Sequence, residues 1–288
     1  MTLPVNFVGI GAAKCGTGSI HRYLGEHPEV FVSPIKETNF FIEDGQRSPR
    51  KRVRSMRAYE RQFAAVEQET AVGEYSPQYM NHPSAATRIA ATLPDANLLV
   101  SLRCPADRAF SAWAGRACSG VERRPAEVAL RPGNPYVDDG FYLQRLAPYL
   151  KLFPREHIKV LVFEEFAADP AATMAGLYRF LGAEPGFEPN VSVRLGTIRY
   201  PRHSRVNAGW QALRRLQPHW FRAPKPLVRW NRALLQRSLA EPPPYDPALR
   251  ARPIELYRDE VAGMEDLLGR DLAMWKALTA PPRPTRRG

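Results

Sequence analysis

The strongest constraint on the fold is a set of short apolar runs that alternate with stretches of helical character. The runs are VNFVGI at 5–10, VFV at 30–32, AVGEY at 71–75, NLLVSL at 97–102 and IKVLVF at 158–163. Each run is too short for a helix and is rich in Val, Leu or Phe, which is typical of strands buried on both faces.

Helical patterns lie between and after these runs, at 18–26, 84–92, 106–116, 140–153 and 170–182. A repeated order of strand and then helix predicts an α/β fold with a mostly parallel sheet flanked by helices. In open sheets of this kind, ligands bind beyond the carboxyl ends of the strands. We therefore look for functional residues where an apolar run ends.

The length and composition limit the classes that need to be considered. A chain of 288 residues suits one large domain, alone or with an appendage. The net charge of +12 favours an anionic ligand or partner. The three cysteines, Cys15, Cys104 and Cys118, form no CxxC pair, which indicates reduced thiols rather than a disulfide framework or a zinc site.

The segments are expected to divide the chain into a core at 1–190, a lid or helical substrate-side segment at 191–245, C-terminal helices packing on the core at 246–280, and a disordered tail at 281–288. The N-terminus lacks a basic region followed by an apolar stretch, and there is no long apolar run of membrane-spanning length. We expect a soluble, cytoplasmic protein with at most peripheral membrane contact. The oligomeric state has no sequence signal.

A glycine-rich loop, GIGAAKCGTGS at 9–19, follows the first apolar run. It matches neither the Walker loop, in which the lysine follows the last glycine, nor the dinucleotide fingerprint. A strand, a glycine turn and a helix start direct backbone N–H groups and a helix dipole at one point, which favours an anion. Lys14 adds a charge there, and Thr17 and Ser19 add hydroxyl donors. The alternative is a solvated turn with a surface lysine.

A second candidate anion site lies in NLLVSLRCPADRAFSAW at 97–113. Arg103 ends an apolar run, and Ser111 follows eight residues later inside the expected helix. A guanidinium offers a fork of donors for a phosphate, and a hydroxyl can complete its shell. The alternatives are an ion pair for Arg103 and a solvated or back-bonded Ser111. Two anion sites on one sheet edge predict a ligand with two phosphate-like groups.

These motifs together resemble a known enzyme family. KCGTGSIHRYLGEHPEVFVSPIKETNFF resembles the 5′-phosphosulfate-binding region of sulfotransferases that use 3′-phosphoadenosine 5′-phosphosulfate (PAPS), especially the carbohydrate and bacterial branch. LRCPADRAFSAW is similar to the 3′-phosphate-binding segment of that family. GEYSPQYM and the ending LLGRDLAMW also look like the family, so the resemblance covers most of residues 5–190 and returns near the C-terminus.

The resemblance implies a single nucleotide-kinase-like domain with about five parallel strands, PAPS as sulfuryl donor, 3′-phosphoadenosine 5′-phosphate (PAP) as product, and no metal. Carried over by position, the phosphosulfate is held by the loop residues Lys14, Cys15, Gly16, Thr17, Gly18 and Ser19. Arg103 and Ser111 hold the 3′-phosphate. Lys14 is also implied to be catalytic, because its cation can meet the charge that grows on the leaving oxygen. None of the six histidines has metal-ligand spacing.

The acceptor hydroxyl needs a base, and Glu37 in KETNFF aligns with the glutamate of the family's KEPHFF-like motif. We expect burial beside Phe40 and Phe41 to raise its pKa. The alternatives for Glu37 are an ion pair with Lys36 or an exposed turn. His82 is a rival base, because imidazole titrates near neutral pH.

The sequence departs from the family pattern at several positions. Relatives that act on glycosaminoglycans often have lysine after the glutamate of GEYSP, where this chain has Tyr75, so an anionic polysaccharide acceptor is less expected. Asn39 and Thr38 replace the usual histidine and proline of the KEPHFF-like motif. The third nucleotide-contacting segment has only weak candidates, at 194–196 or 199–205.

The leading interpretation is a PAPS-dependent sulfotransferase that acts on a hydroxyl, less readily an amine, of a carbohydrate, glycolipid or secondary metabolite, without a nucleic-acid partner. One alternative is a kinase of related fold, which the missing GK[ST] order disfavours. The other is a nucleic-acid or anionic-membrane binder that uses the basic segment 194–237 with Trp210, Trp220 and Trp230.

Overall fold

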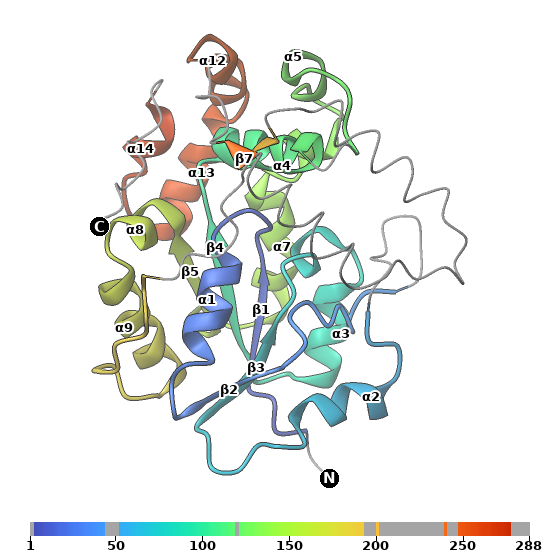
Figure 1. Cartoon of the computed structure of the whole chain (residues 1–288), viewed down its shortest axis with the longest axis vertical. Coiled ribbons are helices and arrows are strands. Elements are labelled where there is room, and N and C mark those ends of the chain that lie inside the picture. Colours follow the sequence, from blue (N-terminus) through green and yellow to red (C-terminus); the bar gives the residue numbers. More distant parts are fainter. Residues whose placement is uncertain are drawn as a thin grey trace.

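A five-stranded parallel sheet forms the centre of the molecule (Figure 1). The computed structural model describes residues 3–43, 52–118, 121–192, 200–201, 239–240 and 247–277. The strands are β1 (Phe7–Gly11), β2 (Val30–Val32), β3 (Ala71–Tyr75), β4 (Asn97–Leu102) and β5 (Ile158–Val162). Their order is β2-β3-β1-β4-β5, and every neighbouring pair is parallel. The predicted α/β class and all five predicted strands are confirmed.

Helices connect and cover the strands. Their bounds are α1 Thr17–Leu24, α2 Met56–Glu60, α3 Ala85–Thr92, α4 Pro105–Cys118, α5 Ala126–Ala129, α6 Pro135–Asp138, α7 Tyr142–Leu152, α8 Phe163–Ala168, α9 Pro170–Leu181, α12 Pro247–Leu256, α13 Arg258–Leu268 and α14 Ala273–Lys276. Short 3-10 helices lie at Arg61–Phe63, Tyr79–Asn81 and Arg155–His157, and β6 (Tyr200–Pro201) pairs antiparallel with β7 (Leu239–Ala240).

The sheet is buried on both faces because its strand residues alternate between two apolar clusters. Phe7 and Leu99 face one side, with residues of α1, α8 and α9. Val8, Leu98 and Val100 face the other side, with residues of α3, α4, α7 and α13. Strands that are covered on both faces have no solvent-exposed side, which is why their sequences are unbroken apolar runs.

The C-terminal helices belong to the same core. Tyr257, Val261, Met264, Leu272 and Trp275 are all buried in the larger cluster. The sequence predicted C-terminal helices at 246–280, and the described residues 247–277 form three, α12, α13 and α14. A break at Tyr257 separates α12 from α13, and Gly269 ends α13 in the left-handed conformation that glycine favours. The segments expected at 194–199, 202–238 and 281–288 lie outside the described residues.

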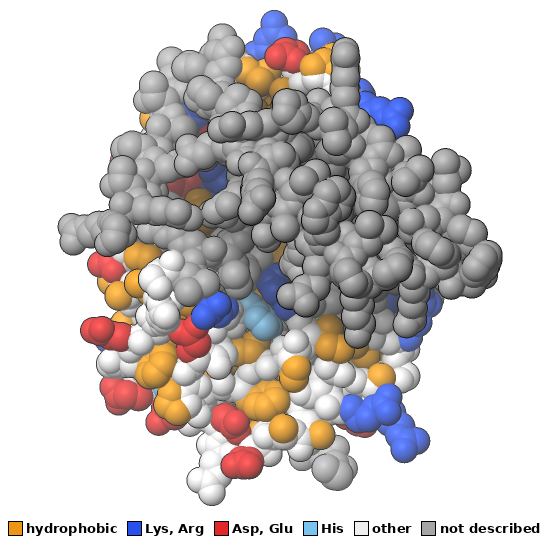
Figure 2. Space-filling model, in the orientation of Figure 1, with side chains coloured by type: hydrophobic (Ala, Val, Ile, Leu, Met, Phe, Trp, Pro, Cys, Tyr) orange, Lys and Arg blue, Asp and Glu red, His pale blue; other side chains and the backbone are white. Residues whose placement is uncertain are grey.

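The described surface carries both charge signs (Figure 2). On the face shown, acidic side chains gather over α9 at the lower left, whereas Lys and Arg lie over α2 at the lower right and at the top. The described part of this face therefore presents no single basic surface. Among the described residues, no helix is long and apolar enough to span a membrane.

The sheet order fixes the place for a ligand. β1 lies between β3 and β4, so the chain passes from β1 to the edge strand β2, returns to β3 beside β1, and then crosses to β4 on the other side of β1. The loops that follow β1 and β4 meet at this change of direction, which is where open α/β sheets bind ligands.

Candidate functional site

The loop between β1 and α1 is fixed by the neighbouring strands. The Ala12 N–H donates to the Ser101 carbonyl of β4 at 2.7 Å, and the Ser101 hydroxyl donates to the Cys15 carbonyl at 2.6 Å. From β3, the Tyr75 hydroxyl donates to the Gly11 carbonyl at 2.8 Å. Three residues of the loop are thus anchored by bonds from both sides, so its conformation is set before any ligand arrives.

The start of α1 suits an anion. Gly16 precedes the helix with φ 79°, and its carbonyl accepts from the Ser19 and Ile20 N–H groups. No side chain caps this end, and its first turn holds no acidic residue, so no protein carboxylate opposes the positive end of the helix dipole. A Cβ on Gly16 would lie 2.9 Å from the Phe163 ring, so only glycine fits here.

Lys14 leaves the loop with a left-handed backbone, φ 75°, and extends toward α4. Its Nζ lies 3.2 Å from the point where a Cβ on Gly115 would stand. Burial, and then the charge of Arg103, lower the pKa of Lys14, while the Cys118 and Cys15 thiols act in the opposite direction. The Arg103 guanidinium therefore lies near enough to act on the charge of Lys14.

Arg103 follows β4 directly. Its carbonyl accepts from the Tyr142 hydroxyl at 2.8 Å, and its Cζ lies 4.8 Å from the centre of the Phe163 ring. Its Nε is buried and has no hydrogen-bond partner among the described residues. The alternative for Arg103, an ion pair, is absent from the described ion pairs, and a buried donor of this kind calls for an acceptor.

Ser111 lies in α4, one helical turn before Gly115 and therefore on the same face of the helix. This is the face that the Lys14 ammonium approaches. The hydroxyl is half-buried. The structure thus brings Lys14, from the first predicted anion site, close to Arg103 and to the face of α4 that carries Ser111, both from the second.

The remaining loop residues contribute in different ways. Thr17 and Ser19 are buried in the first turn of α1. The Cys15 side chain lies in the core cluster, where its Sγ contacts the Ala13 carbonyl at 3.8 Å and burial raises its pKa to about 12. Cys15 and Gly18 can therefore contact a ligand only through their backbone groups.

The predicted surroundings of Glu37 are wrong. Its side chain is 43% exposed and pairs with Lys36 at 2.7 Å, so the ion-pair alternative is the arrangement observed. The aromatic pair turns away from it, with the Phe40 ring stacked on Tyr59 at a centroid distance of 4.4 Å. Glu37 nevertheless lies at the carboxyl end of β3, where its N–H donates to the Tyr75 carbonyl at 3.1 Å.

His21 is a neighbour that the sequence did not indicate. It lies on α1 with its Nε2 3.3 Å from the Ser33 carbonyl. Burial, and then the charge of Lys36, lower its pKa to about 4, although Glu37 acts in the opposite direction. The imidazole is therefore neutral near pH 7. No spacing in the sequence marks it, because the contact depends on how the loop after β2 folds back along α1.

The rival base His82 belongs to another part of the surface. Its Nδ1 lies 3.0 Å from the Ser84 hydroxyl, and after burial its pKa responds to Glu43, Arg52 and Arg88. None of these residues belongs to the loop after β1 or to α4.

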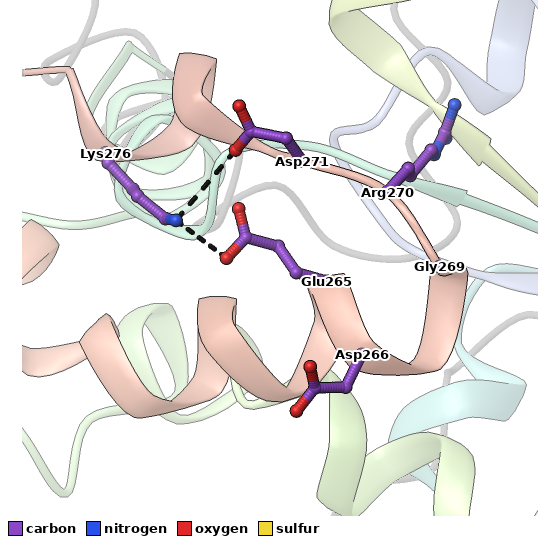
Figure 3. A pocket seen from close by; sticks show the side chains of 6 residues that line it. All are labelled: Glu265, Asp266, Gly269, Arg270, Asp271 and Lys276. Atoms are coloured by element: carbon purple, nitrogen blue, oxygen red, sulfur yellow. Dashed lines mark hydrogen bonds and ion pairs between the residues drawn. The ribbon is translucent and has the colours of Figure 1, made fainter.

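The depression in Figure 3 also lies apart from this site. It is lined by residues of α13 and α14, and Lys276 lies between the carboxylates of Glu265 and Asp271, 2.7 and 3.9 Å away. Its two cations are already paired, Lys276 with Glu265 and Asp271 and Arg270 with Glu165, which leaves no free positive charge suited to an anionic ligand. Within the described ranges, no group of three or more His, Cys, Asp or Glu side chains is arranged to hold a metal ion.

Comparison with known proteins agrees with this geometry. Membrane-associated sulfotransferase kil1 of Dictyostelium discoideum is 31% identical over 111 residues, which are 38% of this chain and 22% of that protein. Heparan sulfate glucosamine 3-O-sulfotransferase 6 of Homo sapiens is 30% identical over 189 residues, which are 60% of this chain and 51% of that protein. The chain spans about half or less of the length of these relatives.

A solved structure matches nearly the whole chain. The crystal structure of a sulfotransferase from Alicyclobacillus acidocaldarius superposes with a TM-score of 0.71 at 30% identity, over 95% of this chain and 99% of that one. A family model described as the sulfotransferase family matches residues 6–189, which include the loop after β1, Glu37 and α4. The chain therefore belongs to the sulfotransferase family.

Proposed function

We propose that the protein is a PAPS-dependent sulfotransferase that moves a sulfuryl group to an acceptor hydroxyl. One observation carries the proposal: the Lys14 ammonium and the Arg103 guanidinium share one site beyond the carboxyl ends of β1 and β4. Two cations in one site favour an anionic ligand, because its charge offsets the repulsion between them.

The residues fit a nucleotide with phosphate groups at both ends. Lys14 and the backbone of the loop through Ser19 would hold the 5′-phosphosulfate, at a helix start that no acidic side chain occupies. Arg103 and Ser111 would hold the 3′-phosphate, and the buried Nε of Arg103 supplies a donor that lacks an acceptor. When bound, the nucleotide supplies the activated sulfuryl group.

The two proposed catalytic groups act on different substrates: Lys14 on the sulfuryl donor and Glu37 on the acceptor. Lys14 is held near α4 by its backbone and by the space above Gly115, so its charge is fixed in place before the reaction, which is how enzymes stabilise developing negative charge. Glu37 is the proposed general base. Its carboxylate is partly exposed beyond β3 and can reach a hydroxyl that enters from solvent.

A carbohydrate is the acceptor class that we favour. The named relative from Homo sapiens is a heparan sulfate glucosamine sulfotransferase, and this chain shares 189 aligned residues with it. Tyr75 points beneath the loop after β1 and is wholly buried, so it offers no contact to an acceptor. The family membership disfavours the kinase alternative. The basic segment 194–237 that motivated a binding protein lies outside the described residues except for Tyr200 and Pro201.

Radiolabelled PAPS with a panel of carbohydrate and small hydroxyl acceptors tests this function. The wild-type protein should give labelled product and bind PAP by calorimetry. Lys14→Ala should lower turnover by at least about a hundredfold, as loss of a positioned charge does in other transfer sites. Lys276→Ala, which removes a lysine from α14, is the matched control and should keep full turnover. Transfer from ATP without PAP binding would contradict the proposal.

A further inference from the structure

A second glutamate lies at the end of β3, and it is wholly buried. Glu74 has no Lys or Arg partner among the described ion pairs. Its carboxylate instead accepts hydroxyl protons: Ser76 Oγ donates to Oε2 at 2.6 Å, and Tyr79 Oη donates to Oε1 at 2.5 Å. The Tyr59 hydroxyl is farther away, at 3.5 Å. A buried charge without a cation is costly, so this one calls for an explanation.

The same two hydroxyls hold the segment that follows Glu37. The Asn39 N–H donates to Ser76 Oγ at 3.0 Å, and the Phe41 N–H approaches Tyr79 Oη at 3.4 Å. Thr38 Oγ1 lies 3.2 Å from Tyr79 Oη as well. Each hydroxyl therefore bridges the buried carboxylate to the backbone of residues 38–41.

This segment needs support, because its backbone is strained. Glu37 has φ 64° and Asn39 has φ 49°, in the left-handed region that residues with a side chain adopt at a cost. Such conformations persist when surrounding bonds over-determine them. The bonds from Ser76 and Tyr79 do so here, on both sides of Asn39.

Proton counting shows why position 74 must only accept. A hydroxyl has one proton, and a carboxylate has none to give. Because Ser76 and Tyr79 both donate to Glu74, their oxygens are left as acceptors toward the N–H groups of the segment. An amide at position 74 would donate one N–H to one hydroxyl. The proton of that hydroxyl would then lose its carboxylate acceptor and turn elsewhere, so one of the two bridges to the segment would be weakened.

We propose that Glu74 is a positioning residue of the transfer site, which holds the strained segment presenting Glu37 by taking the protons of Ser76 and Tyr79. This inference rests on the proposed function, because Glu74 can act in catalysis only if Glu37 is the general base. Burial raises the pKa of Glu74, and the hydrogen bonds from Ser76 and Tyr79 act in the opposite direction without reversing it.

Hydrogen exchange measured by mass spectrometry tests the structural half of this inference without an activity assay. In Glu74→Gln and in Tyr79→Phe, amides of residues 38–42 should exchange at least about tenfold faster than in the wild type, while residues 12–20 are unchanged. Tyr59→Phe is the matched control. It removes a hydroxyl from the same carboxylate, at the longer distance, and keeps the ring that stacks on Phe40. It should exchange as the wild type does.

Steady-state kinetics tests the functional half. Both variants should lose about tenfold or more in kcat, with PAP affinity and the KM for PAPS within about twofold of wild type, because the donor side is untouched. If Glu74→Gln does not fold, Ser76→Ala replaces it. Unchanged exchange at 38–42 in the folded variants overturns the proposal. Faster exchange with unchanged kcat overturns the role at the transfer site, and absence of transfer by the wild type overturns only the proposed function.

Discussion

At the scale of single residues, the position of Lys14, the proposed catalytic lysine, depends on a glycine in another element. Gly115 lies within α4, where glycine weakens a helix relative to alanine. Its missing Cβ leaves the space that the Lys14 ammonium approaches. Glycine at this position therefore lowers the stability of α4 but leaves space for the Lys14 side chain.

These two effects predict that Gly115→Ala stabilises the fold and impairs the reaction. Alanine should raise the free energy of unfolding by about 0.5–1 kcal/mol, measured in urea. Its Cβ would meet Lys14 Nζ at 3.2 Å and displace it, so kcat should fall about tenfold. Gly176→Ala in α9 is the matched control, because nothing lies within 4 Å of the added Cβ. It should stabilise equally and keep full activity; full activity in both variants would contradict the argument.

The residues that sequence could identify are those whose chemistry is local. Lys14 and Arg103 stand beside strand ends within recognisable motifs, and the structure places both at the same sheet edge. Glu37 was found by position, but its surroundings were misjudged, since adjacent Phe residues need not share its direction. Glu74 was overlooked because its partners Ser76 and Tyr79 link it to a segment from another loop, residues 38–41, and no spacing in the sequence records that contact.

At the scale of elements, the strands were predictable and several contacts between helices were not. A strand buried on both faces needs an unbroken apolar run, so its sequence shows it directly. The short helices α2, α5, α6 and α8 were not predicted, because four to six residues are too few to show helical periodicity. The contact between α12 and α4 depends on an ion pair between Arg250 and Asp107, which are 143 residues apart in the sequence.

That pair holds the helix that carries Ser111 and Gly115. Arg250 of α12 donates from Nε and Nη2 to the two oxygens of Asp107, at 2.8 and 3.0 Å. The side chains are only 1% and 5% exposed. A forked, buried pair of this kind is geometrically specific, and removal of one partner leaves a charge that water cannot reach.

Arg250→Met should therefore lower the free energy of unfolding by about 3–5 kcal/mol in urea denaturation. The double variant Arg250→Met, Asp107→Leu should regain most of this loss, since no unpaired charge remains. Arg258→Met in α13 is the control, because its pair with Glu255 is 71% and 65% exposed and should leave the midpoint unchanged. A double variant no more stable than the single one would show that the lost contribution is packing rather than charge.

At the scale of the whole molecule, one carboxylate joins the C-terminal helices to the sheet edge where we propose that the nucleotide binds. Glu164 of α8 accepts from the Cys104 N–H at 3.0 Å and from the Trp275 indole N–H at 2.9 Å. Cys104 directly follows Arg103. Trp275, which is 1% exposed, thus supports the end of β4, where Arg103 is proposed to bind the 3′-phosphate.

Trp275→Phe should destabilise the protein in a pH-dependent way. Burial raises the pKa of Glu164, whereas the two N–H donors favour its charged form. A group whose pKa is raised on folding stabilises the fold while it is protonated, and this contribution is lost as pH rises through the folded-state pKa. Loss of the indole donor raises that pKa further. The variant's deficit in urea denaturation should therefore be about 1–3 kcal/mol at pH 8 and smaller at pH 5.

The same substitution should weaken PAP binding, because the turn after Arg103 loses part of its support, and calorimetry at both pH values measures this. Lys276→Ala is the neighbouring control. Its ammonium pairs with Glu265 and Asp271 at the surface, so the variant should match the wild type in PAP affinity and denaturation midpoint. An equal deficit for Trp275→Phe at pH 5 and pH 8 would show that the ring's packing, and not its bond to Glu164, joins the C-terminal helices to the site.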